Sequence, residues 1–132
     1  DKELFKFNYD FIRGNNLEGK VLGGNIRCLL KLAGTEFLPG FDNNILFLEA
    51  MGGDFNKIST FASQLYQIGA FNNIKGLLLG TFLEYEEKSN ISVEEIFIKY
   101  LPKDIPIVKT KELGHLSNSK AIEIGGYIKL NK

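Results

Sequence analysis

The stretch Asn44-Ile45-Leu46-Phe47-Leu48-Glu49 places four consecutive apolar residues directly before a carboxylate, and a turn of small residues follows it. A short apolar run bounded by turn signals is typical of a strand that is buried on both faces of a sheet. In open α/β sheets, ligands gather just beyond the carboxyl ends of such strands. Glu49 lies at this end, so its carboxylate is expected to be hydrogen-bonded, paired or functional.

Helical and strand-like patterns alternate on both sides of this stretch. Apolar residues recur with helical spacing after Asn25, and again after Asp54 or Asn56, either of which has the side chain to cap a helix. The strand-like runs are residues 20–22, 44–49, 74–80 and 105–108. A strand, a helix and a strand in succession favour a right-handed crossover, which predicts an α/β fold with a partly parallel central sheet. Parallel pairing would bring the ends after Glu49 and Gly80 to one edge.

Four other segments complete the predicted secondary structure. Aromatic and charged residues alternate over residues 5–11, which indicates an edge strand or an extended connector. Residues 84–88 are strongly charged and are expected to form a solvated loop. Ser92 begins a capping-box pattern that predicts a third helix. Residues 121–130 contain two strand-like runs around a glycine pair, which predicts a hairpin.

The composition indicates one soluble domain over residues 1–132. Hydrophobic residues make up 44% of the chain, and the 16 basic and 16 acidic residues cancel, so no nucleic-acid or polybasic membrane surface is expected. No apolar run approaches the roughly 20 residues of a membrane span. A single cysteine excludes an internal disulfide and favours a reducing, cytoplasmic compartment. Because the chain opens on Asp1, we expect it to be part of a longer protein.

The only histidine, His115, is a candidate general base. It follows Gly114 in a predicted loop after a strand, which is where site residues tend to lie. If its imidazole meets Glu49, the carboxylate would accept the Nδ1 proton and leave Nε2 as the base toward a nucleophile. A surface or structural histidine is the alternative interpretation, and the sequence by itself does not establish that the two side chains meet.

The chain contains no clear nucleophile to accompany these two residues. A nucleophile elbow of the Gly-x-Ser-x-Gly type is absent from the sequence. Cys28 lies near a predicted helix start, but an inert thiol is the simpler interpretation. With one histidine and no clustered ligands, no metal site is predicted.

Three further residues are candidates for contacting a substrate. Gly24 and Asn25 precede the first predicted helix, where a glycine pair lets the backbone pass close to a ligand or to a neighbouring strand. Neither a dinucleotide fingerprint nor a phosphate loop is completed there. Glu84 lies just past a strand end, where its carboxylate could reach a substrate amine.

A series of short motifs follows in a characteristic order along the chain. They are Gly23-Gly24-Asn25-Ile26, Leu32-Ala33-Gly34-Thr35 with Pro39, Ile45-Leu46-Phe47-Leu48-Glu49, Gln64-Leu65 with Gly69, Lys75-Gly76, Gly80-Thr81-Phe82, Pro106-Ile107 and Gly114-His115. In order and spacing, over roughly residues 14–130, the chain resembles the C-terminal domain of the LD-carboxypeptidases. These are serine peptidases that also include the microcin C self-immunity peptidases.

The resemblance implies a Ser-His-Glu triad in which Glu49 and His115 are the acid and the base. The serine would lie in an N-terminal nucleophile domain that this chain lacks, so the chain alone is expected to be inactive. The implied reaction removes the terminal D-alanine from cytoplasmic murein tetrapeptides during cell-wall recycling, without a metal or organic cofactor. The family also implies a bacterial enzyme, commonly a homodimer, whose C-terminal domain is a swivelling β/β/α layered fold.

Departures from the family pattern leave two alternatives open. Ala50 and Gly53 replace acidic residues that usually follow the glutamate, and Ser59-Thr60 lies where an arginine is typical. The parent protein could instead be a self-immunity peptidase that acts on a peptide-nucleotide antibiotic. It could also be a non-catalytic binding or interaction domain on the same scaffold.

Overall fold

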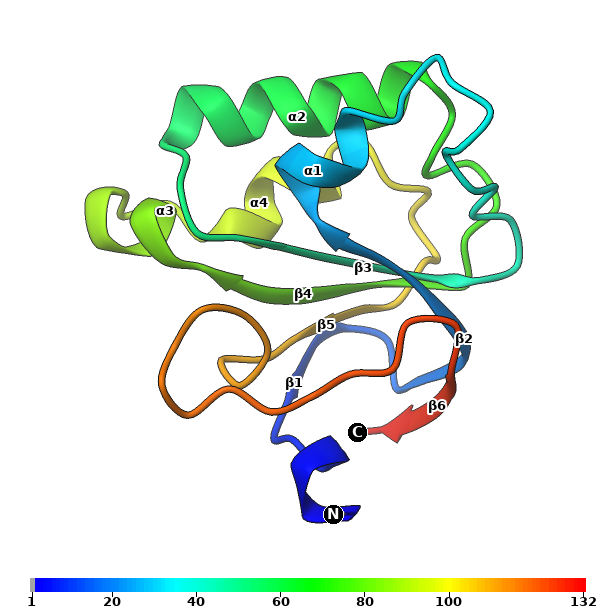
Figure 1. Cartoon of the computed structure of the whole chain (residues 1–132), viewed down its shortest axis with the longest axis vertical. Helices are drawn as coiled ribbons and strands as arrows, with labels where there is room; N and C mark the ends of the chain where they lie inside the picture. The colour runs from blue at the N-terminus through cyan, green and yellow to red at the C-terminus, as the bar shows by residue number, and fades with distance from the viewer. Residues whose placement is uncertain (1) are drawn as a thin grey trace.

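A computed structural model describes residues 2–132 of the chain, which form a curled six-stranded sheet with the α-helices on one face and a short N-terminal 3-10 helix on the other side (Figure 1). The strands are β1 (Asp10–Arg13), β2 (Asn16–Asn25), β3 (Ile45–Ala50), β4 (Gly76–Phe82), β5 (Ile107–Lys109) and β6 (Tyr127–Asn131). The helices are the 3-10 helix η1 (Lys2–Phe5), α1 (Ile26–Leu30), α2 (Phe55–Gln67), α3 (Leu83–Lys88) and α4 (Val93–Ile98). None of the helices formed by residues 2–132 has both the length and the apolar character needed to cross a bilayer.

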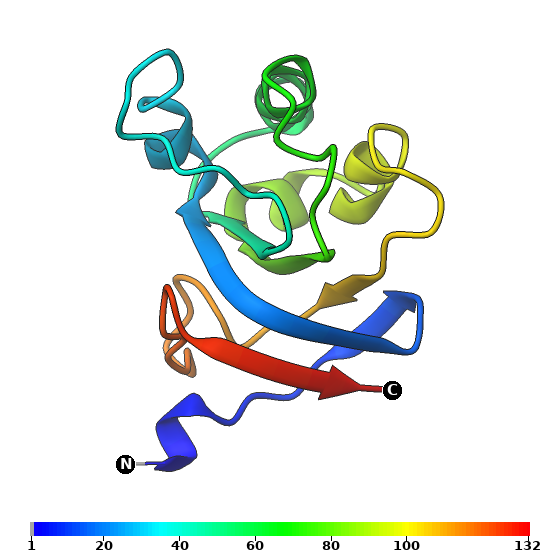
Figure 2. The ribbon, with the colours of Figure 1, turned by 90° about the vertical axis from the view of Figure 1, so that its right-hand side faces the viewer.

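The strand order β1-β5-β4-β3-β2-β6 has a parallel centre and antiparallel edges. Strands β2, β3, β4 and β5 pair in parallel, as the strand–helix–strand pattern predicts. The first half of β2 pairs with β6 and its second half pairs with β3, so the sheet curls around this long strand (Figure 2). The predicted α/β class, with a partly parallel sheet in a β/β/α layered arrangement, is confirmed.

Alternate residues of the buried strands face two separate cores. Leu46 and Leu48 of β3 belong to the core beneath the helices. Ile45 and Phe47 belong to a second core, on the curled side of the sheet, where Phe7 and Tyr9 also pack. Because side chains alternate along a strand, Glu49 shares the curled side with Ile45 and Phe47.

The two helices that flank β3 begin where their capping residues predict. Asn25 Oδ1 accepts a hydrogen bond from the Cys28 backbone N–H at 3.2 Å, and α1 starts at the next residue. Asp54 Oδ1 accepts from the Lys57 N–H at 2.9 Å at the start of α2, so Asp54 rather than Asn56 is the cap. Ser92 lies at the N-cap position of α4, but its side chain makes no capping hydrogen bond.

Two predictions of local structure are wrong, the first because of contacts between distant segments and the second because a short helix forms directly after β4. Residues 121–124 form no strand; β6 pairs with β2, and the Val21 backbone bonds both Gly125 and Gly126, so the expected hairpin does not form. The charged segment 84–88 is helical, since α3 begins directly after β4 and a Glu84–Lys88 pair spans one turn.

The tight contact between Gly23 of β2 and the Phe47 backbone of β3 predicts that alanine substitutions at Gly23 and at Gly24 have different effects on stability. Gly23 and Gly24 both have positive φ, but only at Gly23 would a Cβ overlap the carbonyl oxygen of Phe47. We expect Gly23→Ala to lower the free energy of unfolding by about 2 kcal/mol more than Gly24→Ala, the cost of overpacking beyond shared backbone strain. Urea denaturation of both variants measures the difference, and equal losses would contradict the close approach.

Candidate active site

The Glu49 side chain occupies the carboxyl end of β3 and is almost completely buried. Its register partner on β2 is Asn25, so the last residue of β2 lies beside it. The side chain is 11% exposed, whereas its neighbours on the same face of β3 are apolar. A carboxylate in this position requires a partner, because an unpaired buried charge is strongly unfavourable.

The loop that carries His115 is held against the end of β4. The Thr81 backbone N–H donates to the Leu113 carbonyl oxygen at 2.8 Å, and the His115 N–H donates to Thr81 Oγ1 at 3.3 Å. Farther along the loop, the Ser119 hydroxyl donates to the Gly114 carbonyl oxygen at 2.8 Å. These three hydrogen bonds fix the loop on both sides of the imidazole.

Two glycines allow this docking. A Cβ on Gly80 would overlap the Leu113 carbonyl oxygen, and a Cβ on Gly114 would overlap the Thr81 hydroxyl. Gly114 also has a φ of +143°, a conformation that residues with a side chain rarely adopt. The glycine before the histidine is therefore required both for its conformation and for the space beside Thr81.

The docked loop brings the His115 imidazole to the Glu49 carboxylate. The sequence alone did not establish that these two side chains meet. His115 Nε2 lies 2.9 Å from Glu49 Oε2. The expected assignment of the ring nitrogens is wrong: Nε2 faces the acid, so Nδ1 is the nitrogen left to face a substrate or nucleophile. The histidine side chain is 38% exposed against 11% for the glutamate, so the imidazole is accessible and the carboxylate is shielded.

The contact has the distance of a hydrogen bond but not its direction. Glu49 Oε2 is buried and accepts no hydrogen bond of standard geometry from the described residues. The imidazole is its partner by proximity and not through an aligned N–H donor. Two other buried side-chain atoms of the described residues also lack a partner, Ser59 Oγ and the Tyr85 hydroxyl, so the unpaired oxygen does not by itself mark a functional position.

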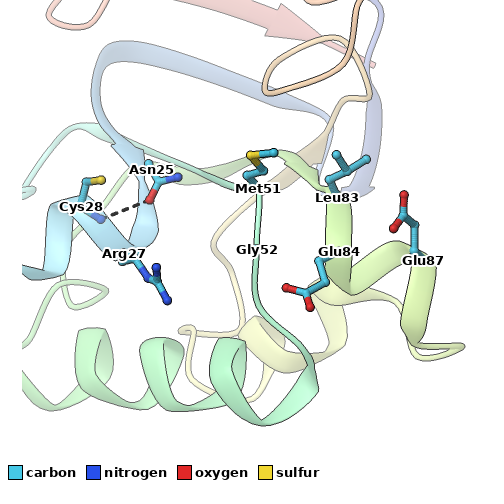
Figure 3. A pocket seen from close by; sticks show the side chains of 8 residues that line it. All are labelled: Asn25, Arg27, Cys28, Met51, Gly52, Leu83, Glu84 and Glu87. Carbon is cyan, nitrogen blue, oxygen red and sulfur yellow. Dashed lines mark hydrogen bonds between the residues drawn. The ribbon is translucent and has the colours of Figure 1, made fainter.

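A groove of about 500 Å³ opens at the same end of the sheet (Figure 3). It is lined by Asn25, Arg27, Cys28, Met51, Gly52, Leu83, Glu84 and Glu87. Two of the three predicted substrate-contacting residues, Asn25 and Glu84, are therefore at the groove, whereas Gly24 is not among its lining residues. That any of the three contacts a substrate stays a prediction.

The Glu84 carboxylate already has two protein partners. Its Oε2 accepts a short hydrogen bond from the Gly53 N–H, and its Oε1 pairs with Lys88 Nζ at 2.6 Å. The Gly53 hydrogen bond, followed by the Lys88 ammonium, lowers the pKa of Glu84 from its ordinary value of 4.5. The carboxylate thus ties the turn after β3 to α3 and remains anionic at neutral pH.

Sequence reasoning missed two residues at this site. Thr81 holds the His115 loop; it lies in the Gly80-Thr81-Phe82 motif at the end of an apolar run, but the sequence predicted no role for it. Arg27 reaches the groove from α1 and had no signal beyond its place in the first turn of a predicted helix. Cys28 is exposed at the same groove.

Within residues 2–132, no three His, Cys, Asp or Glu side chains gather closely enough to hold a metal ion.

Comparison with known proteins identifies the class to which this fold and site belong. The family model of the LD-carboxypeptidase C-terminal domain matches residues 18–130. The chain therefore belongs to the family of LD-carboxypeptidase C-terminal domains.

Individual relatives agree with this assignment. The "Putative carboxypeptidase YocD" of Bacillus subtilis is 31% identical over 83% of this chain, which corresponds to 34% of that protein. The solved structure of the microcin C7 self-immunity protein MccF matches with a TM-score of 0.83 and 25% identity, over 96% of this chain and 39% of that one. A muramoyltetrapeptide carboxypeptidase from Oxalobacter formigenes shares the fold, with a TM-score of 0.78 at 24% identity, over 96% of this chain and 46% of that one. The chain spans about a third of the length of the curated relatives it matches.

The Thr81 hydroxyl predicts a local effect on the histidine loop. Thr81→Val keeps the branched shape but removes the acceptor of the His115 N–H, at a cost of about 1 kcal/mol. We expect faster hydrogen exchange at the His115 amide, measured by NMR. Thr110→Val is the matched control, because Thr110 is also buried, while its hydroxyl donates to the Asn8 carbonyl oxygen and accepts from the Glu112 N–H rather than from the His115 N–H. Equal acceleration in both variants would contradict a specific role for Thr81.

The lowered pKa of Glu84 predicts how the turn after β3 responds to acid. A carboxyl whose pKa is depressed by folding stabilises the protein above its unfolded value, and that contribution is lost as pH falls through the folded pKa. The difference in unfolding free energy between wild type and Glu84→Gln should therefore shrink as pH falls from about 6 to about 3. The NMR chemical shift of the Gly53 amide proton should change over this pH range in the wild type but not in Glu84→Gln. A difference that is constant with pH would contradict this role.

Proposed function

We propose that this chain supplies the acid and the base of a Ser-His-Glu carboxypeptidase whose serine lies in a separate N-terminal nucleophile domain. The proposal rests chiefly on one observation, the 2.9 Å contact between His115 Nε2 and Glu49 Oε2 at the carboxyl end of the sheet. The exposed imidazole, the buried carboxylate and the family membership all agree with it.

In this mechanism each group has one task. Nδ1 of His115 takes the proton of the serine hydroxyl as the serine oxygen attacks the scissile carbonyl carbon. Glu49 orients the ring through Nε2 and stabilises the imidazolium that forms. Nδ1 then returns the proton to the departing amine. In the second half of the reaction, Nδ1 takes a proton from a water molecule, whose oxygen attacks the acyl-serine carbonyl carbon, and the proton passes to the serine oxygen as the acyl group is released. Thr81 acts as a positioning residue, because it holds the backbone of His115.

The proposed substrate is a murein tetrapeptide that loses its terminal D-alanine in the cytoplasm. Support comes from the carboxypeptidase relatives, which include one named a murein peptide carboxypeptidase in Bacillus subtilis. The similarity to MccF favours a second candidate, the hydrolysis of a peptide-nucleotide antibiotic. A non-catalytic binding domain is a third candidate, and it differs from both in making His115 dispensable.

Two assembly partners belong to the same proposal. The nucleophile domain must face the exposed part of the His115 side chain, because the proposed base has to reach the serine hydroxyl. Without it, the chain has a base but nothing to activate, so the chain alone should be inactive. A homodimer of the complete protein is also proposed, on family grounds.

Reconstituted hydrolysis tests the catalytic roles. Mixing the 132-residue chain with an intact N-terminal nucleophile domain should release D-alanine from a murein tetrapeptide, detected by mass spectrometry. His115→Ala should lower the rate by about 10³-fold or more, because it removes the general base. Glu49→Gln should lower it by about 10²-fold or more, because it leaves the ring without its anionic partner.

A matched control separates the loss of a catalytic carboxylate from the loss of a buried negative charge elsewhere in the protein. Glu94→Gln removes another largely buried carboxylate, whose Oε1 lies 2.9 Å from Lys109 Nζ, and should leave the rate within a small factor of wild type. Hydrolysis that survives His115→Ala would overturn the proposal. Release of product from a peptide-nucleotide but not from a tetrapeptide would favour the self-immunity alternative.

A further inference from the structure

The loop that carries His115 is closed at its base by a backbone hydrogen bond. The Lys120 N–H donates to the Glu112 carbonyl oxygen at 2.6 Å, so residues 112–120 form a histidine loop with His115 between its ends. One side of this loop is bonded to the end of β4 through Thr81. The position of the imidazole therefore also depends on what holds the two ends of the loop.

The N-terminal segment of the chain bonds to both ends of the histidine loop. At the start of the loop, Glu112 Oε2 accepts from the Asn8 N–H at 2.6 Å, and Glu112 Oε1 accepts from Asn8 Nδ2 at 3.2 Å. Directly after the loop, the Ala121 N–H donates to the Leu4 carbonyl oxygen at 2.8 Å. Residues 4–9, which we call the N-terminal strap, therefore cross the base of the loop, on the side of the sheet away from the α-helices (Figure 1).

The Glu112 carboxylate is the main connection between the strap and the start of the loop. Hydrogen bonds to an ionised carboxylate are stronger than those between neutral groups, and both oxygens of Glu112 bind Asn8. The Thr110 hydroxyl, which lies before the loop, also donates to the Asn8 carbonyl oxygen, at 2.6 Å. Both Glu112–Asn8 bonds are independent of that hydroxyl, so Glu112 rather than Thr110 joins the strap to the loop.

The strap is itself fixed to the rest of the domain. Phe7 and Tyr9 pack against the core on the curled side of the sheet, and their rings meet edge to face with centroids 6.0 Å apart. The Tyr9 hydroxyl donates to the Asn131 carbonyl oxygen at 2.9 Å and accepts from the Asn131 N–H at 3.1 Å. Because the rings on both sides of Asn8 are anchored, the strap can hold the histidine loop in one position.

We propose that the N-terminal strap positions the histidine loop, and that Glu112 is a positioning residue for the proposed general base. Its carboxylate binds Asn8 three residues before His115, so it acts through the loop backbone and not on the reacting atoms. The strap and Thr81 together keep His115 Nε2 at 2.9 Å from Glu49 Oε2. This inference rests on the proposed function, because it assigns the strap a role in that reaction.

The single imidazole of the chain is a direct reporter of the loop. His115 is the only histidine, so its ring signals can be followed by NMR without overlap from another imidazole. Glu112→Ala removes both acceptors of Asn8. We expect the ring signals to move toward their positions in the urea-unfolded chain, and the Thr81 amide to exchange about tenfold faster, the effect of losing about one hydrogen bond to a charged group. The Leu77 amide, in the interior of β4, should keep its exchange rate, which separates local opening from global destabilisation.

Three further variants serve as controls. Glu123→Ala removes an exposed carboxylate just after the loop and leaves the bonds of the strap to Glu112 and Ala121 in place, so the ring signals should not move. Asn8→Ala removes one of the two donors and should produce a smaller shift in the same direction as Glu112→Ala, with no added effect in the Glu112→Ala background. Glu112→Gln keeps one carbonyl oxygen for the Asn8 N–H and should also have a smaller effect.

The reconstituted hydrolysis assay tests the catalytic consequence. Glu112→Ala should lower kcat about tenfold and leave the KM for the murein tetrapeptide unchanged, because the strap positions the base and contacts no substrate. Glu112→Gln should recover part of this loss, and Glu123→Ala should change neither constant. A loss confined to global stability would leave kcat unchanged at temperatures where every variant is folded.

The strap and the catalytic proposal fail in different ways. Unmoved ring signals in Glu112→Ala, or equal shifts in Glu112→Ala and Glu123→Ala, would overturn the role of the strap. Moved signals with an unchanged kcat would overturn Glu112 as a positioning residue. If the wild-type mixture hydrolyses nothing while Glu112→Ala still moves the His115 signals, the effect of the strap on the loop is sustained and the catalytic proposal is overturned.

Discussion

The hydrogen bond from the Thr81 N–H to the Leu113 carbonyl oxygen is the contact on which the site depends. It extends the edge of β4 by one interaction and places the following loop across Gly80, where a larger residue would block it. Only then does His115 lie over the end of β3. Backbone hydrogen bonds thus hold the His115 loop in place, and the imidazole ring remains partly exposed.

The register of β3 supplies the other half of the site. Glu49 faces the curled side of the sheet because side chains alternate, and a shift of one residue would turn it toward the apolar core beneath the helices. The tight approach of Gly23 to the Phe47 backbone opposes such a shift, since β2 and β3 fit closely in one register. Packing two residues away from the carboxylate along β3 therefore contributes to its orientation.

Features determined by nearby residues could be predicted from the sequence. The buried strand β3, the crossover to β4 and the caps Asn25 and Asp54 each follow from neighbours a few positions away. Features determined by distant partners could not. The run at 121–124 has a strand-like pattern, yet β2 bonds with Gly125 and Gly126 instead. The orientation of the His115 ring likewise depends on a docked loop, for which the sequence contains no periodic signal.

Glu49 Oε2 lacks an aligned donor, and the side chains of Glu49 and His115 differ strongly in exposure; the two observations are best considered together. A buried carboxylate without a well-directed donor weakens the fold, and a purely structural histidine would be expected to turn and satisfy it. Here the ring instead remains accessible on its far side, while the acid stays shielded from water. Low solvent access would strengthen the attraction between the carboxylate and the imidazolium that the proposed mechanism forms. A shielded acid beside a partly exposed imidazole is therefore the arrangement that the proposed general base requires.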